Sequence, residues 1–347
     1  RPMYRRMVIL AEGRFGPLTS KTANQAIRYI PEQIIGIIDS RQAGKNVETV
    51  IGFGGNIPIL ASLKEFLNKS PDTLLIGIAP TGGRLPDAWR PIIIDAINNK
   101  LNIISGLHTY LSEDPEFITT ARKAGVRLID LRKVPQEYEV VSKGLWKKRR
   151  AKTILTVGSD CNVGKMTASY ELHREFLRRG LKSAFVATGQ TGILISGKGV
   201  CVDSVVGDYI AGSVEKAIEE IAQDADYIHV EGQGSLTHQG YSSVTLGMIH
   251  GVMPDAMIMV HHPIRVVDDY GLHLDNLSEF IKLHEIIISP FKKSKVVGIA
   301  LNTVNMKGDE IKQAEMSIKK TTNLPVGNVL SPEVQILADA LLKYFKK

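Results

Sequence analysis

The sequence has few cysteines and no long apolar run, and each shortage excludes a class of protein. Only two of its 347 residues are cysteine, Cys161 and Cys201. That number excludes a disulfide framework and makes a reducing cytosol the expected compartment. No apolar run reaches the roughly 18 residues of a membrane-spanning helix. The apolar stretch at residues 7–11 is shorter than the about 7–15 residues of a secretory signal, so we expect a cytoplasmic protein without a membrane partner.

The composition is that of an ordinary globular protein with an excess of positive charge. Hydrophobic residues make up 44% and charged residues 23%, which argues against disorder. At about 100–200 residues per domain, the length predicts about two domains. The net charge of +7 indicates an anionic partner, either nucleic acid, a membrane surface or a phosphate-bearing ligand.

Much of this positive charge lies in one short run, residues 143–150, K-G-L-W-K-K-R-R. A basic patch for nucleic acid is one interpretation. The run lacks aromatic residues other than Trp146, and no nucleic-acid motif accompanies it. We therefore interpret it as a linker with Trp146 packed against one domain, and we expect no nucleic-acid partner.

Short apolar runs alternate with amphipathic segments along almost the whole chain. Such runs are typical of strands buried on both faces of a parallel sheet. The expected strands are residues 7–11, 34–38, 74–79, 102–105, 127–131, 153–157, 184–187, 227–230, 256–260, 296–301 and 326–330. Helical periodicity appears at residues 166–179, 214–222, 277–287 and 334–345. The alternation predicts an α/β fold with two parallel-sheet domains.

The strongest motif is T-I-L-T-V-G-S-D-C-N-V-G-K-M-T at residues 153–167. Glycines let backbone N–H groups converge on a phosphate, the helix start adds its positive dipole end, and Lys165 reaches the phosphates. The match to G-x-x-x-x-G-K-[ST] is imperfect, because five residues separate the glycines and Met166 replaces the hydroxyl. We predict that phosphate or nucleotide is bound by Gly158, Ser159, Asp160, Cys161, Asn162, Val163, Gly164, Lys165, Met166 and Thr167.

This loop resembles the G-T-D-T-x-V-G-K-T loop of dethiobiotin synthetases, which use ATP and Mg²⁺ on small carboxylates. Residues 227–235 are similar to their V-E-G-A-G-G segment, whose acid at a strand end helps to hold the metal. The resemblance implies Thr167, Asp203 and Glu231 as the metal ligands, with Asp208 competing for the place of Asp203. It also implies that Asn302, at the end of another strand, recognises adenine; an Asn that satisfies its own turn is the alternative.

Several longer stretches resemble a closer family. They are G-S-D-C-N-V-G-K-M-T, T-G-Q-T-G at 188–192, E-G-Q-G-S-L-T-H-Q-G-Y at 231–241 and V-H-H-P at 260–263. Together they look like a two-domain family of nucleotide-binding proteins without an assigned reaction, some of whose members are described as D-glutamate N-acetyltransferases. The resemblance implies an N-terminal Rossmann-like domain, taken as residues 1–142, a basic linker at 143–152, and a C-terminal P-loop NTPase-like domain at 153–347.

Polar side chains on loops that follow strands are the candidates for substrate binding and catalysis, because such loops line the ligand crevice of open α/β sheets. They are Gln190 and Ser235 for substrate, and Gln233 and His238 for catalysis. His238 would act as a general base; a polar loop histidine that binds substrate or water is the alternative. Cys161 as a nucleophile is a weaker hypothesis than a small side chain facing the loop.

The first domain reads as alternating strands and helices but lacks G-x-G-x-x-G after its first strand. Asp39 ends the second strand, and this lone acid does not predict NAD. Glycine-bearing turns lie at residues 53–56 and 80–84. Arg84, in the second turn, is a candidate ligand for a carboxylate or phosphate. The outline resembles the CoA-binding domains of acyl-CoA synthetases; tight turns without a ligand are the alternative.

Three functions remain open at this point. The first is N-acetylation of D-glutamate or a similar amino acid from acetyl-CoA. The second is an ATP-dependent ligase of the dethiobiotin synthetase type, with ATP and Mg²⁺ as cofactors. The third is a nucleotide-dependent switch without catalysis. For the enzymes we expect a small-molecule substrate, an amino acid or carboxylate, bound between the domains of a homo-oligomer.

Overall fold

The computed structural model describes residues 5–78 and 83–346, which divide into two compact units. Unit 1 comprises residues 1–133 and 193–197, and unit 2 comprises residues 134–192 and 198–347. Each unit contains one six-stranded sheet. All the strand pairs in both sheets are parallel, so the predicted fold class is confirmed. The predicted domain boundaries at residues 142 and 153 stay predictions.

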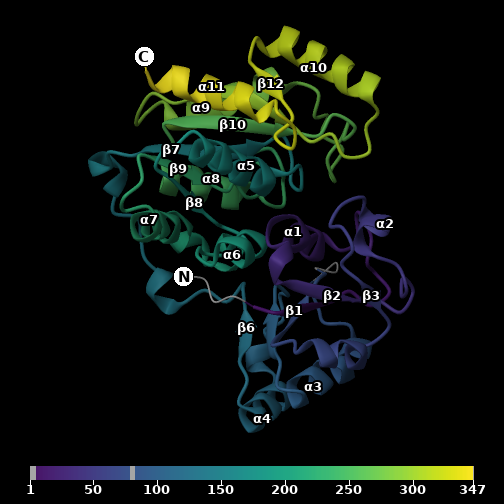
Figure 1. The fold of residues 1–347 in the computed structure, drawn as a ribbon. Coiled ribbons are helices and arrows are strands. Elements are labelled where there is room, and N and C mark those ends of the chain that lie inside the picture. Colours follow the sequence, from purple (N-terminus) through teal and green to yellow (C-terminus); the bar gives the residue numbers. More distant parts are fainter. Residues whose placement is uncertain (1–4, 79–82, 347) are drawn as a thin grey trace. The chain divides into compact units, whose positions relative to one another are not determined.

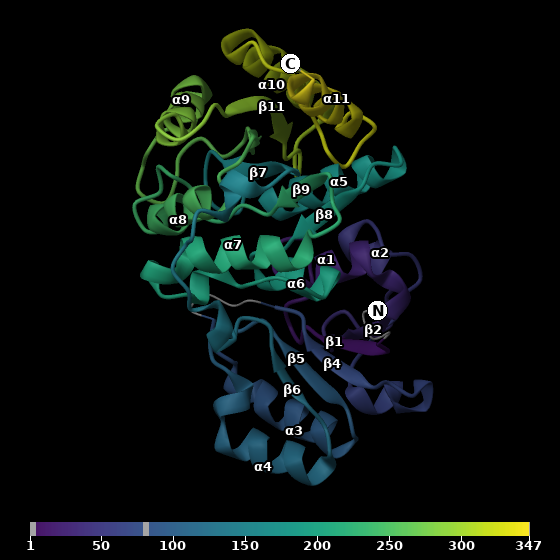
Figure 2. The ribbon, with the colours of Figure 1, turned by 90° about the vertical axis from the view of Figure 1, so that its left-hand side faces the viewer.

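The sheet of unit 1 has the strand order β3-β2-β1-β4-β5-β6. Its strands are β1 (Met7–Leu10), β2 (Ile34–Ile38), β3 (Ile59–Leu60), β4 (Thr73–Ile76), β5 (Asn102–Ser105) and β6 (Leu128–Asp130). Its helices are α1 (Lys21–Tyr29), α2 (Val47–Ile51), α3 (Arg90–Asn98) and α4 (Pro115–Ala124). Helices α3 and α4 lie on one face of the sheet and α1 on the other (Figures 1 and 2). Five strands coincide with the apolar runs, whereas β3 is too short for a pattern. The predicted run 74–79 ends at Ala79, outside the described residues.

The sheet of unit 2 has the strand order β12-β11-β10-β7-β9-β8. Its strands are β7 (Lys152–Gly158), β8 (Ser183–Val186), β9 (Tyr227–Val230), β10 (Ala256–His261), β11 (Lys295–Leu301) and β12 (Val326–Gly327). Its helices are α5 (Lys165–Arg178), α7 (Ile210–Ile221), α8 (Ser242–Val252), α9 (Leu277–Ile288), α10 (Gly308–Thr322) and α11 (Val334–Phe345), while α6 (Gln190–Ser196) begins in unit 2 and ends in residues counted with unit 1. Each of the six apolar runs predicted for this half overlaps a strand, although β12 covers only the first two residues of the run 326–330.

The four helices that the sequence predicts correspond to α5, α7, α9 and α11. Helix α8 is apolar around most of its circumference, and α10 is mostly polar. Helix α8 lacks the single apolar stripe by which an amphipathic helix is recognised, so the pattern missed it. Helices α1, α3, α4 and α10 do have a buried face and were nevertheless not among the four predicted helices. Within the part of the chain that the structure describes, no helix combines the length and apolar character of a membrane span.

Strand β7 lies in the middle of its sheet and is buried on both faces. Its residues Leu155 and Val157 belong to a core cluster shared with α7, α8 and α9. Its residue Ile154 belongs to a second cluster shared with α5 and α11. Alternate residues of a strand point to opposite faces, so these clusters are the two faces of one sheet. The loop that follows β7 therefore starts from a strand that is paired on both sides and buried on both faces.

The basic segment before β7 is attached to unit 2. The carboxylate of Glu215, on α7 and 2% exposed, accepts the backbone N–H groups of Lys143 at 2.6 Å and Leu145 at 2.8 Å. Arg149 pairs with Glu219 at 2.8 Å. Trp146 packs against the core of unit 2. Part of the positive charge in this segment is thus neutralised within the fold.

Candidate phosphate-binding site

The turn between β7 and α5 needs glycine at its start and at its end. A side chain at Gly158 would place its Cβ 2.6 Å from the carbonyl oxygen of Asp160 and 2.7 Å from Nζ of Lys165. Gly164 has a φ of +108°, and Asn162 has a φ of +54°. These left-handed conformations, which glycine adopts without strain, curl residues 159–164 between strand and helix.

Lys165 is the first residue of α5 and is only 6% exposed. Its Nζ donates to the carbonyl oxygen of Asp160 at 2.8 Å. The side-chain stem lies beside Gly232, where an added Cβ would come within 3.1 Å of Cδ of Lys165. The ammonium group is thus held against the loop, in the position from which a P-loop lysine reaches phosphate.

Two side chains from other parts of the chain, those of His261 and Ser235, hydrogen-bond to the loop. The hydroxyl of Ser159 hydrogen-bonds with Nδ1 of His261, the last residue of β10, at 2.8 Å. The hydroxyl of Ser235 donates to the carbonyl oxygen of Gly158 at 3.3 Å. Burial lowers the pKa of His261 to about 4, so the ring is neutral near pH 7. Ser235, predicted to bind substrate, therefore braces the phosphate loop in this structure.

The three predicted metal ligands occupy different surroundings. Thr167 is half-buried in the first turn of α5. Glu231, 3% exposed, accepts the N–H of Thr188 at 3.0 Å through Oε2. Asp203 accepts from the thiol of Cys201 at 3.0 Å. Their shared role in holding Mg²⁺ stays a prediction, as does the competing role of Asp208.

One predicted glutamine, Gln233, contacts Glu231, and the other, Gln190, lies beside Cys201. Nε2 of Gln233 donates to Oε1 of Glu231 at 2.9 Å, and Oε1 of Gln190 lies 4.0 Å from the thiol of Cys201. An added Cβ atom at Gly189 would come within 2.6 Å of Nε2 of Gln233, and one at Gly192 within 2.4 Å of Oε2 of Glu231, so a larger residue at either position would displace these side chains. This polar cluster continues from β9 directly into Gly232, which contacts Lys165.

His238 is buried at 2% exposure beside two partly exposed tyrosines. Its ring stacks on Tyr241 with centroids 4.8 Å apart and meets Tyr270 edge-on at 5.2 Å. The backbone N–H of Gly240 donates to Nδ1 at 3.2 Å, which assigns the ring proton of the neutral form to Nε2. Nε2 lies 3.4 Å from a carboxylate oxygen of Asp269. In this form His238 offers a hydrogen-bond donor, and the general-base role stays a prediction.

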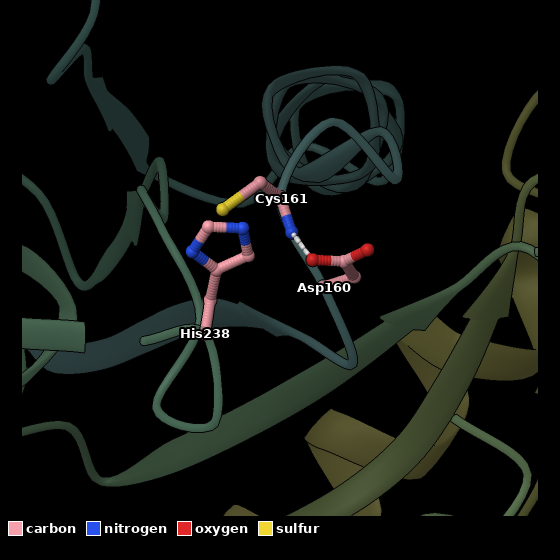
Figure 3. Close-up of side chains that lie close together, drawn as sticks. All are labelled: Asp160, Cys161 and His238. Atoms are coloured by element: carbon pink, nitrogen blue, oxygen red, sulfur yellow. Dashed lines mark hydrogen bonds between the residues drawn. The ribbon is translucent and has the colours of Figure 1, made fainter. Parts of the chain in front are cut away.

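Asp160, Cys161 and His238 bring three potential donor atoms together. Among the described residues, this is the one group of His, Cys, Asp and Glu side chains that meets the spacing of a metal site, with the three atoms within 4.8 Å of one another. Figure 3 shows the thiol of Cys161 turned toward the ring of His238, and the carboxylate of Asp160 bonded to the backbone N–H of Cys161 at 2.7 Å.

The surroundings of this group suit an anion better than a metal cation. Arg265 places Nε 2.6 Å from Oδ2 of Asp160, and Lys165 lies against the same loop. A metal-bound histidine donates from its second nitrogen, whereas His238 accepts a bond there. Burial also raises the pKa of the Cys161 thiol, which disfavours the thiolate that a metal or a nucleophilic mechanism needs.

Sequence reasoning missed Arg265 and Asp269. Both lie in residues 262–276, which follow β10 at the same edge of the sheet as the phosphate loop. Asp269 contacts both His238 at 3.4 Å and Nη2 of Arg265 at 3.3 Å, and Arg265 contacts Asp160. The available signal was their position after a buried strand, since the carboxyl ends of parallel strands meet at one edge.

Asn302 contacts the phosphate loop from β11. Its Nδ2 donates to the carbonyl oxygen of Val163 at 3.1 Å, and its Oδ1 accepts the N–H of Val304 at 3.1 Å. The side chain therefore ties the loop to the end of β11 and also stabilises its own turn. Recognition of adenine by Asn302 stays a prediction.

Arg84 belongs to unit 1 and is exposed. Residues 80–82 of the predicted glycine turn 80–84 lie outside the described residues. The role of Arg84 in substrate binding stays a prediction. In the same unit Asp39 accepts the backbone N–H groups of Gly13 at 3.0 Å, Phe15 at 2.9 Å and Arg41 at 3.0 Å. This acid therefore closes the loop after β1.

Comparison with known proteins agrees with this architecture. Residues 140–338 match a family described as "Domain of unknown function (DUF1611_C) P-loop domain", and residues 40–134 match its "(DUF1611_N) Rossmann-like domain". The chain belongs to the DUF1611 family. The predicted family, with its Rossmann-like first domain and P-loop second domain, is thereby confirmed.

Two curated relatives of this DUF1611 protein are named D-glutamate N-acetyltransferase. The protein from Tritonibacter scottomollicae is 36% identical over 298 residues, which cover 84% of this chain and 87% of the relative. The protein from Pseudoalteromonas sp. is 38% identical over 260 residues, which cover 72% and 76%. A crystal structure of a DUF1611 family protein from Anabaena variabilis is 34% identical, with a TM-score of 0.92 over 98% of this chain and 99% of that chain.

Proposed function

We propose that this DUF1611 protein transfers the acetyl group of acetyl-CoA to the amino group of D-glutamate or a similar amino acid. The identity to two curated D-glutamate N-acetyltransferases, over 84% and 72% of the chain, carries the proposal. In this reaction the amine nitrogen attacks the thioester carbonyl and the C–S bond breaks. The sulfur leaves as the thiol of CoA after taking the proton that the amine gives up.

In this proposal the phosphate loop of unit 2 binds phosphate groups of the acetyl donor. The Lys165 ammonium, the helix start and the Nε2–H of His238 all suit an anion. The thioester lies at the far end of the pantetheine arm from the diphosphate of CoA. A loop that binds the diphosphate therefore keeps Cys161 away from the acetyl group, and the raised pKa of its thiol agrees with a role outside the chemistry.

A second candidate is an ATP-dependent ligase that activates a small carboxylate. Glu231 favours it, because a buried carboxylate at the end of β9 is the type of group that holds Mg²⁺ beside a P-loop. In this alternative Thr167, Asp203 and Glu231 hold the metal, Lys165 contacts the ATP phosphates, and an amine captures the activated carboxylate.

An acetyl-transfer assay separates the two candidates. The purified chain is incubated with acetyl-CoA and D-glutamate, and release of free CoA thiol is measured together with N-acetylglutamate. We expect turnover without ATP or Mg²⁺, and a preference for D- over L-glutamate. Turnover that requires Mg²⁺-ATP, with phosphate released in proportion, would favour the ligase. Absence of product from both mixtures would contradict the proposal.

Lysine variants test whether the phosphate loop takes part. Lys165→Ala removes the buried ammonium group, and Lys282→Ala removes an exposed lysine on α9 as the matched control. We expect the first variant to bind acetyl-CoA roughly 10- to 100-fold more weakly, since a charge-assisted bond to phosphate is lost. The control should bind as the wild type does. If the wild type and both variants bind acetyl-CoA with equal affinity, the proposed role of the phosphate loop is contradicted.

A further inference from the structure

All three guanidinium nitrogens of Arg265 contact oxygen atoms in or beside the phosphate loop. Nε lies 2.6 Å from Oδ2 of Asp160, Nη1 donates to the carbonyl oxygen of Cys161 at 3.3 Å, and Nη2 lies 3.3 Å from Oδ1 of Asp269. The side chain is 27% exposed. Arg265 thus joins the loop that follows β7 to the segment that follows β10.

The segment that carries Arg265 is itself held in a closed turn. Asp268, 7% exposed, accepts the backbone N–H groups of Tyr270 at 2.8 Å and Leu272 at 2.9 Å. The backbone N–H of Leu274 donates to the carbonyl oxygen of Val266 at 2.9 Å. Because these bonds order the chain on the C-terminal side of Arg265, the guanidinium group is positioned before any ligand arrives.

The contacts of Arg265 differ in strength. Its pair with Asp160 is short, and that carboxylate is only 1% exposed, so it depends on a counter-ion. The two Nη contacts, at 3.3 Å, are longer than a usual N–H···O bond. Asp269, which accepts one of them, is 68% exposed and already solvated. A phosphate at the loop can therefore replace the Nη contacts while Nε stays on Asp160.

We propose that Arg265 is a second phosphate-binding cation of the loop, which gives Nη1 and Nη2 to a diphosphate while its Nε remains paired with Asp160. The proposal rests on the proposed function, in which the loop binds the phosphates of an acetyl donor or of ATP. A diphosphate carries more negative charge than Lys165 alone neutralises. The planar fork of arginine binds two phosphate oxygens at once, which a lysine cannot do.

A simpler role would be to neutralise Asp160 without contact to the ligand, and a double-mutant cycle separates the two. The proteins are wild type, Asp160→Asn, Arg265→Met and the double variant. Affinity is measured by calorimetry for CoA, for ATP and for inorganic pyrophosphate. If Arg265 binds phosphate, Arg265→Met weakens binding roughly 10- to 100-fold in both backgrounds. If it only neutralises Asp160, the double variant binds as tightly as Asp160→Asn, and the proposal is overturned.

Arg265→Lys keeps the charge beside Asp160 and tests the fork separately. We expect it to melt as the wild type does and to bind CoA about 10-fold more weakly, since one of the two phosphate contacts is lost. Wild-type affinity in this variant would overturn the proposal even where Arg265→Met fails to fold. Arg178→Met is the matched control, because Arg178 also pairs with a buried carboxylate, Glu175 at 2.7 Å, at the far end of α5.

The outcomes also separate this inference from the proposed function. Wild-type protein that binds none of the three probes contradicts the role of the loop. If the wild type binds CoA, Lys165→Ala does not, and both Arg265 variants bind it as tightly as the wild type, only the role of Arg265 is contradicted. Tighter binding of CoA than of ATP, with both sensitive to Arg265, assigns the diphosphate to the acetyl donor.

Discussion

The two units have similar sheets, but the loops that follow their first strands are contacted by groups of opposite charge. In unit 1 the loop after β1 gives its backbone N–H groups at Gly13 and Phe15 to the carboxylate of Asp39. In unit 2 two cations donate to backbone carbonyl oxygens of the loop after β7. Lys165 donates to that of Asp160, and Arg265 donates to that of Cys161. The first loop is closed on an anion of its own chain. The second presents positive charge at a helix start, which suits an anion from outside.

The largest contrast is expected in acid. Burial lowers the pKa of His173, His261 and His284 to about 4 and holds that of His229 well below its ordinary value, and all four lie in unit 2. Between pH 6.5 and 4 these histidines bind protons in the unfolded chain but stay neutral in the folded unit. The free energy of unfolding of unit 2 therefore falls as the pH falls through this window, by roughly 1 kcal/mol per pH unit for each histidine.

The two tryptophans report on the units separately, Trp89 in unit 1 and Trp146 in unit 2. Urea unfolding of the Trp89→Phe and Trp146→Phe variants would be followed by fluorescence at pH 7 and pH 5. We expect the midpoint reported by Trp146 to move to lower urea at pH 5 more than that reported by Trp89, because unit 1 contains one histidine, His108. Equal shifts would show that the buried histidines do not set the difference.

Asp39→Asn should weaken unit 1 and leave ligand binding in unit 2 unchanged. The amide cannot accept all three backbone N–H groups that the carboxylate accepts, so we expect a loss of about 2–3 kcal/mol in the unfolding free energy of unit 1. Trp89 fluorescence measures the stability, and calorimetry measures CoA affinity. A variant of wild-type stability would contradict the role given to Asp39.

Alanine at one glycine of each loop gives a matched pair. At Gly158 the new Cβ would lie 2.6 Å from a backbone oxygen, so the loop must shift; we expect roughly 10- to 100-fold weaker CoA binding. At Gly13, with φ +69°, the nearest atom is 3.5 Å away, so the cost is the backbone strain of about 1 kcal/mol in unit 1. Similar binding losses in both variants would break the comparison between the loops.

Asn302→Ala should have the smallest effect. It removes the bond from Nδ2 to the Val163 carbonyl, and we expect about 3- to 10-fold weaker binding of every phosphate ligand. ATP and GTP are compared by calorimetry. Because both polar groups of the side chain are bonded within the protein, we expect both nucleotides to weaken alike. A selective loss of ATP would support the prediction that Asn302 recognises adenine.

Local patterns predicted most of the fold. Strands buried on both faces are nearly continuous apolar runs, and ten of the eleven predicted runs lie wholly within the described residues and contain a strand; the eleventh, 74–79, overlaps β4 before its end at Ala79. The phosphate loop was also visible, since its glycines and lysine are adjacent in the chain. Strand β3, with two residues, and helix α8, without a single apolar stripe, left no such pattern.

The sequence by itself determined the alternation of strands and helices, the presence of two parallel sheets and the position of the loop around Lys165. Only the tertiary structure decided which distant residues surround that loop. Arg265 stands 105 positions after Asp160, and they meet because β10 lies next to β7 in the sheet. Strand order depends on the packing of all the helices and strands of a unit. No short stretch of sequence encodes it, and so the second cation of the site was found only in the fold.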